Sequence, residues 1–135
     1  MNVLVIDDDA QFAQDLAEAW PNGSEVVVEY AGSSIEALEM IRSRVPEAIV
    51  LDLTMPAWLA AEPSREGLAL LGALVAGSMG QLPIIVATES DDRELTLWCH
   101  RLGARDVFTK SGGLDPIYEA LADALEEVKQ RTRKR

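Results

Sequence analysis

Residues 48–56, Ala-Ile-Val-Leu-Asp-Leu-Thr-Met-Pro, place an acid directly after a short apolar run. Four apolar residues in succession, bounded by a turn signal, predict a strand that is buried on both faces, as in a parallel sheet. A carboxylate at the carboxyl end of such a strand lies where open α/β sheets bind their ligands. This stretch therefore predicts a parallel sheet and a functional acid, Asp52.

Three further apolar runs end in polar residues in the same way. If the strands are parallel, their carboxyl ends meet at one edge of the sheet, and the polar groups converge there. The runs and the residues that close them are 3–6 with Asp7, Asp8 and Asp9, 84–87 with Thr88, and 107–109 with Lys110.

Strand and helix patterns alternate five times along the chain. Such alternation predicts right-handed crossovers and a parallel sheet with helices on both faces. The fold expected is α/β and flavodoxin-like, with five strands in the order 2-1-3-4-5 and a site at the switch point between the first and third strands. The expected strands are 3–6, 26–30, 48–51, 84–88 and 107–109, and helices follow each of them.

Helix starts are marked by residues that accept hydrogen bonds from free backbone N–H groups. Asp9 is expected to cap the first helix rather than to act as a ligand, Ser33 the second, and Asp91 the fourth. Gly103 is the expected end of the fourth helix.

Composition limits the class of protein. With 135 residues and 48% hydrophobic content, one compact domain is expected. A net charge of -11 argues against nonspecific nucleic-acid binding. No apolar stretch approaches the roughly 18 residues of a membrane span, no secretory signal is visible, and the single Cys99 suits a reducing compartment. We therefore expect a cytoplasmic protein.

The acid cluster predicts metal-assisted phosphoryl chemistry. Neighbouring carboxylates repel one another, and a hard cation such as Mg²⁺ relieves that repulsion through oxygen ligands. A carboxylate can then attack phosphorus, while the metal and a lysine offset the charge on the phosphoryl oxygens.

The four motifs together resemble the receiver domain of two-component response regulators, from Val3 to about Val128. The resemblance implies that Asp52 is the phosphoacceptor and that Mg²⁺ is the cofactor. It also implies roles for the other residues at the strand ends. These are Asp8 as a direct metal ligand, Asp7 as an assisting one through water, the Thr54 carbonyl as a further ligand, Thr88 as the switch hydroxyl and Lys110 as the phosphoryl contact.

Three positions depart from the family pattern. Glu89 replaces a small residue beside Thr88, Val107 replaces the switch aromatic, and Ser111 replaces a proline that usually follows a cis peptide bond. We expect a trans bond before Ser111, because a non-proline cis bond costs roughly 2.5–4 kcal/mol. The loop 57–66 is longer than usual, and we expect its Trp58 to pack locally rather than to form a lid.

The resemblance also implies partners. The phosphoryl group is expected to come from a sensor histidine kinase or phosphotransfer protein, and the output to be a separate protein or an effector domain. Residues 1–128 would form the receiver domain and the basic residues 129–135 a tail or the start of a linker. A homodimer through the fourth helix, fifth strand and fifth helix is a further candidate. No membrane contact, no direct nucleic-acid contact and no enzyme activity beyond self-phosphorylation and autodephosphorylation are expected.

Other classes of protein remain open at this stage. A pseudo-receiver would keep the fold and switch without phosphate, which Glu89, Val107 and Ser111 favour and the complete acid set opposes. A phosphoester hydrolase with an aspartyl nucleophile would want an acid two residues after Asp52, where Thr54 stands. A nucleotide-binding flavodoxin-like protein would need a glycine-rich loop after the first strand, and the sequence has none there.

Overall fold

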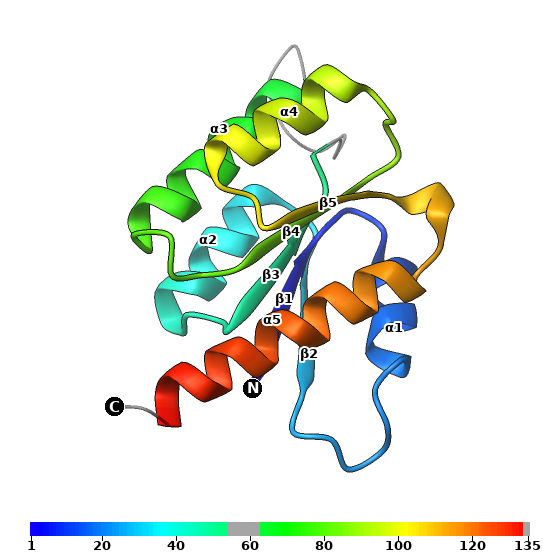
Figure 1. Ribbon diagram of the computed structural model, residues 1–135, viewed down its shortest axis with the longest axis vertical. Coiled ribbons are helices and arrows are strands. Elements are labelled where there is room, and N and C mark those ends of the chain that lie inside the picture. Colours follow the sequence, from blue (N-terminus) through cyan, green and yellow to red (C-terminus); the bar gives the residue numbers. More distant parts are fainter. Residues whose placement is uncertain (54–62, 134–135) are drawn as a thin grey trace.

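The computed structural model describes residues 1–53 and 63–133, and no side chain between 63 and 66 is described. Figure 1 shows strands and helices alternating along the chain. The strands are β1 (Asn2–Ile6), β2 (Val27–Ala31), β3 (Ala48–Leu51), β4 (Ile84–Thr88) and β5 (Asp106–Thr109). The helices are α1 (Ala10–Glu18), α2 (Ser34–Ser43), α3 (Pro63–Gly77), α4 (Arg93–Leu102), the short 3₁₀ turn η1 (Lys110–Gly112) and α5 (Asp115–Arg133).

The strands form one parallel sheet in the order β2-β1-β3-β4-β5. This confirms the predicted fold class and strand order. Ile6 of β1 pairs with Leu51 of β3, so the residues that follow them, Asp7 and Asp52, leave the sheet side by side. The predicted switch point is therefore the place where the two acids meet.

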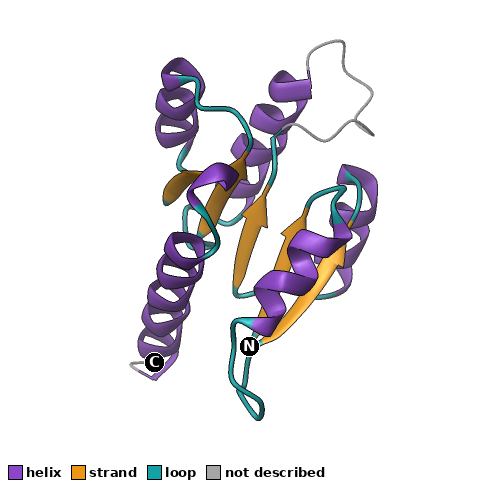
Figure 2. Ribbon diagram, turned by 90° about the vertical axis from the view of Figure 1, so that its right-hand side faces the viewer, coloured by secondary structure: helices purple, strands orange, loops and turns teal. Residues whose placement is uncertain are grey.

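Helices cover both faces of the sheet, as Figure 2 shows from the side. Successive strand residues point to opposite faces, so each strand contributes to two cores. Leu4 and Ile6 pack toward α2, α3 and α4, whereas Val3 and Val5 pack toward α1 and α5. Because the central strands are buried on both faces, their carboxyl ends are held in a fixed position.

The helix starts follow the predicted capping pattern, with one correction. The Asp9 side chain accepts from Gln11 N at 3.0 Å, and the Ser33 hydroxyl accepts from Glu36 N at 3.2 Å. The cap of α4 is Asp92, whose Oδ1 accepts from Glu94 N at 2.9 Å, so the choice of Asp91 was wrong. Two adjacent acids satisfy the capping preference equally, and only the backbone conformation separates them.

Helix α2 leaves much of its apolar surface in solvent. Ile35, Leu38 and Val45 are 65%, 49% and 64% exposed, while Ala37 is fully buried. The helix ends at Ser43, so Val45 lies beyond it. In the sequence, Ile35, Leu38, Ile41 and Val45 recur at helical period and predict an amphipathic helix. The contact with the core is instead made by the small Ala37 together with Met40 and Ile41.

Two glycines stand where a larger residue would be strained. A Cβ on Gly67 would lie 2.8 Å from both Cα and O of Leu53, so α3 touches the main chain directly after Asp52. Gly103 has φ +106° and ends α4, as the sequence predicted. The first of these contacts sets how near α3 comes to the acid-bearing end of β3.

Candidate functional site

Asp7 and Asp52 are acids held by the sheet itself. Asp52 N donates to Ile6 O at 2.9 Å, and Asp7 N donates to Ala31 O at 3.0 Å, so the backbone ladder extends to both residues. Their relative exposures are 1% for Asp7 and 4% for Asp52. Acids are rarely so buried unless paired or bound to a metal, which marks this edge of the sheet as a functional site.

Asp8 completes a cluster of three carboxylates. One carboxylate oxygen from each of Asp7, Asp8 and Asp52 lies within 4.8 Å of the others. Asp8 is exposed, so the cluster opens to solvent on that side. An all-oxygen set of two buried acids and one exposed acid fits a hard cation such as Mg²⁺, which takes few protein ligands and keeps several waters.

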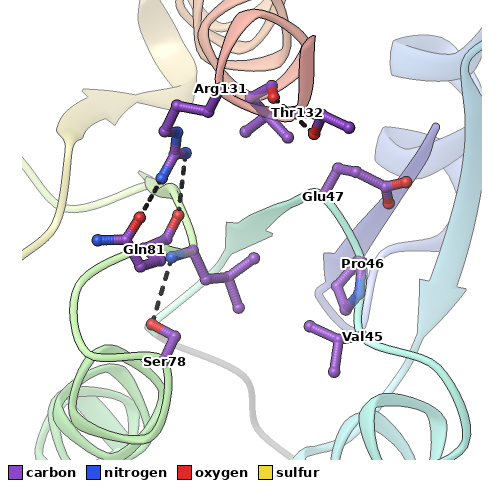
Figure 3. A pocket seen from close by; sticks show the side chains of 9 residues that line it. Val45, Pro46, Glu47, Ser78, Gln81, Arg131 and Thr132 are labelled. Atoms are coloured by element: carbon purple, nitrogen blue, oxygen red, sulfur yellow. Dashed lines mark hydrogen bonds between the residues drawn. The ribbon is translucent and has the colours of Figure 1, made fainter. Parts of the chain in front are cut away.

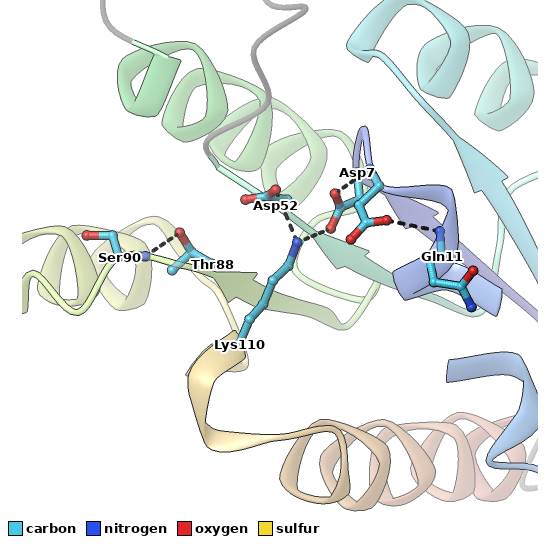
Figure 4. Close-up of polar contacts among 7 residues, drawn as sticks. Asp7, Gln11, Asp52, Thr88, Ser90 and Lys110 are labelled. Carbon is cyan, nitrogen blue, oxygen red and sulfur yellow. Dashed lines mark hydrogen bonds and ion pairs between the residues drawn. The ribbon is translucent and has the colours of Figure 1, made fainter. Parts of the chain in front are cut away.

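Lys110 extends from the end of β5 toward the same acids (Figure 4). Its Nζ lies 2.6 Å from Asp7 Oδ2 and 3.4 Å from Asp52 Oδ2. The other oxygen of Asp7, Oδ1, accepts from Asp9 N at 2.9 Å, so Asp7 is held on both sides. The structure thus brings the predicted lysine to the predicted acids, and pairs it most closely with Asp7.

The ionisation of this pair reflects its burial. Loss of solvation raises the pKa of Asp7 to about 6, against the opposing effect of its hydrogen bond from Lys110. Burial alone would lower the pKa of Lys110, but the hydrogen bond to Asp7 and the negative charge of Asp52 outweigh it and raise that pKa. At neutral pH the lysine is therefore a cation between two acids, and the Asp7 carboxylate is ionised at a cost.

Thr88 ends β4 beside these groups, with 2% exposure. Its hydroxyl accepts from Ser90 N at 3.3 Å, which orients the side chain at the start of the loop leading to α4 (Figure 4). The buried Thr88 hydroxyl thus lies at the carboxyl end of β4, directly before the loop that leads to α4.

The three departures from the family pattern lie around this edge. Glu89 is exposed directly after Thr88. Val107 packs against the core on the α2, α3 and α4 side of the sheet. Ser111 is exposed in η1 with its hydroxyl 3.3 Å from Thr109 Oγ1, and no peptide bond among the described residues is cis, as predicted for this turn.

Several sequence-based expectations fall outside the described residues. The Thr54 carbonyl and Trp58 belong to the undescribed residues 54–62, and only the backbone of the rest of the loop 57–66 is described. The expected metal contact at Thr54 stays a prediction, as does the local packing of Trp58.

One contact was missed from the sequence. The ring of Phe12, in the first turn of α1, lies under the Lys110 ammonium, with Nζ 4.6 Å from the ring centroid. In the sequence, the spacing of Phe12, Leu16 and Trp20 predicts only an apolar helix face. The sequence does carry a signal for this contact, because Phe12 is only five residues after Asp7. A helix that begins directly after the acids starts at the same edge of the sheet, so its first turn lies near them.

Cys99 and His100 lie near the carboxyl end of α4. Burial raises the pKa of the Cys99 thiol to about 11, which makes it a core residue rather than a nucleophile.

A separate pocket of about 250 Å³ lies at the opposite edge of the sheet (Figure 3). It is bounded by the residues before β3, the connection before β4, and the end of α5. Arg131 donates to Gln81 Oε1 at 2.5 Å and to Gln81 O at 3.1 Å along its rim. Because the strands begin here and the acids lie where they end, this pocket is not part of the acid site.

Comparison with known proteins agrees with this geometry. The family model described as "Response regulator receiver domain" matches residues 3–122. The chain is 31% identical over 130 residues to the response regulator MprA of Mycobacterium tuberculosis, covering 96% of this chain and 52% of MprA. The chain therefore spans about half the length of that relative.

Two solved structures resemble the chain over nearly all of its length. The receiver domain of the Francisella response regulator 1452 has a TM-score of 0.76 at 25% identity and covers 93% of this chain and 97% of its own. A response regulator from Burkholderia pseudomallei, solved with a phosphorylated aspartic acid, calcium ion and citrate, has a TM-score of 0.73 at 26% identity, covering 97% of this chain and 72% of its own.

These findings identify the family of the chain. The chain belongs to the response regulator receiver domains, the phosphoacceptor domains of two-component signalling. No helix among the described residues is long and apolar enough to cross a membrane.

Proposed function

We propose that Asp52 accepts a phosphoryl group from a histidine on a sensor kinase or phosphotransfer protein. The observation that carries this proposal is the meeting of three carboxylates within 4.8 Å with a lysine ammonium that contacts two of them, at the carboxyl edge of the sheet. A carboxylate oxygen of Asp52 attacks phosphorus, the nitrogen–phosphorus bond of the donor breaks, and its electron pair returns to the imidazole. The product is an acyl phosphate on Asp52.

Each neighbouring residue has a part in this step. Mg²⁺, when bound, would screen the phosphoryl oxygens, with Asp8 and Asp52 as direct ligands, Asp7 assisting and the Thr54 carbonyl as a further ligand. Lys110 would move its ammonium from the carboxylates toward the incoming oxygens. The Thr88 hydroxyl would turn toward the acyl phosphate, which biases the loop before α4.

The signal would leave through α4, β5 and α5, because Thr88 and Lys110 lead into them. Residues 1–128 would act as the receiver unit, and residues 129–135 as a basic tail or the start of a linker to an effector domain. Helix α5 runs to Arg133, so most of this tail extends that helix. A homodimer on the same surface, a cytoplasmic location and no enzyme activity beyond self-phosphorylation and autodephosphorylation belong to this proposal. Neither membrane contact nor direct nucleic-acid contact is part of it.

The proposal draws support from the Burkholderia pseudomallei structure, which carries a phosphorylated aspartic acid and a calcium ion in a related fold. Its oxygen-binding divalent ion belongs to the same chemical class as Mg²⁺.

Intact-mass measurement after incubation with acetyl phosphate tests the assignment. The wild type should gain one phosphoryl group with Mg²⁺ and none with a chelator, and Asp52→Asn should gain none. Asp123→Asn, which changes an exposed acid on α5, should label like the wild type. Equal labelling of the wild type and Asp52→Asn would refute Asp52 as the acceptor, and a wild type that never labels would favour a pseudo-receiver.

A further inference from the structure

The ammonium of Lys110 has a third contact besides the two acids. Its Nζ lies 4.6 Å from the centroid of the Phe12 ring, over the ring face, while it is 2.6 Å from Asp7 and 3.4 Å from Asp52. A cation within about 6 Å of an aromatic face is attracted by the negative charge on that face. The lysine is thus held by two carboxylates and one ring.

The ring differs from the carboxylates in what happens to it during phosphotransfer. On the proposed function, Asp52 loses its negative carboxylate when it becomes an acyl phosphate, and Asp7 shares its oxygens with a cation. The Phe12 ring keeps its charge distribution throughout. It packs partly buried against the core between the sheet, α1 and α5, so its position is set by the fold.

The position of the Lys110 ammonium is set by its side-chain contacts, because the backbone alone does not fix so long a side chain. It begins the three-residue turn η1, which is followed by Gly113 at φ +89°. A lysine stem has many rotamers, and holding one of them costs entropy. The Lys110 side chain is only 15% exposed, and a cation–π contact is stronger where water is excluded.

We propose that Phe12 is a positioning residue for phosphotransfer, whose ring face holds the Lys110 ammonium between Asp7 and Asp52, ready to meet the phosphoryl oxygens. This role rests on the proposed function of Asp52. Phe12 itself contacts neither the phosphoryl group nor the metal, and acts through Lys110 alone.

Progressive fluorination of the Phe12 ring separates this electrostatic role from a steric one. Fluorine draws electron density from the ring face while the ring keeps nearly the same shape. We expect the rate of Asp52 phosphorylation by acetyl phosphate to fall with each added fluorine, by about threefold to tenfold for the most fluorinated ring. In a Lys110→Met background the same series should leave the residual rate unchanged.

The chain offers a matched control, because Phe108 is its only other phenylalanine and packs in the same core. Fluorinated phenylalanine at position 108 should leave the rate at the wild-type value. Phe12→Tyr should keep most of the rate, since a phenol retains the aromatic face, whereas Phe12→Leu should lose as much as the most fluorinated ring. Equal rates across the Phe12 series, or an equal loss at Phe108, would overturn the proposal.

A spectroscopic measurement on the unphosphorylated protein tests the contact itself. The ε-methylene protons of Lys110 should be shifted upfield by the ring current in the wild type and in Phe12→Tyr, and should return toward their ordinary position in Phe12→Leu. An unshifted wild-type resonance would overturn the proposal even if phosphorylation proceeds. A shifted resonance in a wild type that never labels would instead locate the failure in the proposed function of Asp52, and with it end the positioning role.

Discussion

At the scale of single residues, the buried Asp7 carboxylate has the clearest consequence. Its pKa in the folded protein is about 6, mainly because burial penalises the charged form. An acid whose pKa is raised on folding binds its proton more tightly in the native state. This residue therefore favours the fold below its unfolded pKa, near 4, and opposes it increasingly as the pH rises through about 6.

Asp7→Asn should accordingly stabilise the metal-free protein at neutral pH. We expect a higher free energy of unfolding at pH 7.5, by up to roughly 3 kcal/mol, and a much smaller difference from the wild type at pH 4.5. Urea unfolding in the presence of a chelator measures both values. Asp123→Asn should show no such dependence on pH. A difference between Asp7→Asn and the wild type that is constant across pH would remove Asp7 as its source.

Glu89 gives a second prediction at this scale. It is exposed beside Thr88, where its charge would meet an incoming phosphoryl donor. Like charges about 4 Å apart repel by roughly 4 kcal/mol at an effective dielectric near 20, and by less where solvent and salt screen them. Glu89→Ala should therefore speed Asp52 phosphorylation several-fold at low salt, and Glu18→Ala should not. If Glu89→Ala reacts at the wild-type rate at both low and high salt, Glu89 has no part in the step.

At the scale of helices and strands, the predicted output surface is α4, β5 and α5. Val107 stands where the family pattern has an aromatic, and it packs against the core on the α4 side of the sheet. A valine there has no ring to swing between a buried and an exposed position. On the proposed function, we expect Thr88 to act on this surface through the backbone and the loop between β4 and α4.

We expect a phosphoryl mimic such as beryllofluoride to change amide shifts over α4, β5 and α5 by a smaller amount than in receivers that carry an aromatic at this position. A ligand shifts the equilibrium between two conformations only by its difference in affinity for them. Thr88→Val should abolish most of the change in amide shifts, because it removes the hydroxyl that we expect to contact the mimic in only one of the two conformations. Large shifts confined to α1 and α2 would place the output on another face.

The sequence predicted elements and site well where the signal is local and strong. The strand order and the convergence of Asp7, Asp8, Asp52 and Lys110 followed from apolar runs that end in polar residues. The sequence did not indicate that Lys110 would lie closer to Asp7 than to Asp52, because the rotamer of a long side chain depends on packing. The exposure of the apolar residues of α2 was not predicted either, because helical periodicity does not indicate how much of the apolar face the sheet covers.

At the scale of the whole molecule, the acid cluster links cation binding to folding. The chain carries a net charge of -11, and three of its acids meet at one edge. A ligand that binds only the native state stabilises it, by about 2.7 kcal/mol at a hundred times its dissociation constant. Millimolar Mg²⁺ should therefore raise the Tm of the wild type.

Asp8→Ala should reduce that rise and, without metal, should itself stabilise the fold by relieving repulsion among the acids. Asp123→Ala should keep the wild-type response to Mg²⁺. Calorimetric titration and thermal unfolding measure affinity and Tm on the same samples. An unchanged Mg²⁺ affinity in Asp8→Ala would remove Asp8 from the metal site.

At Gly67 and Leu53, two backbone segments of the chain lie against each other with no side chain between them. Within a helix, glycine is about 1 kcal/mol less favourable than alanine, so helix propensity alone would select against it at this position. The close contact with Leu53 nevertheless requires glycine, because any Cβ at position 67 would clash with the Leu53 backbone. In a saturation-mutagenesis library selected for signalling, position 67 should therefore accept glycine alone, while its exposed neighbour Ala69 accepts many residues. The segment that follows β3 thus constrains which residues α3 can tolerate fifteen positions after Asp52.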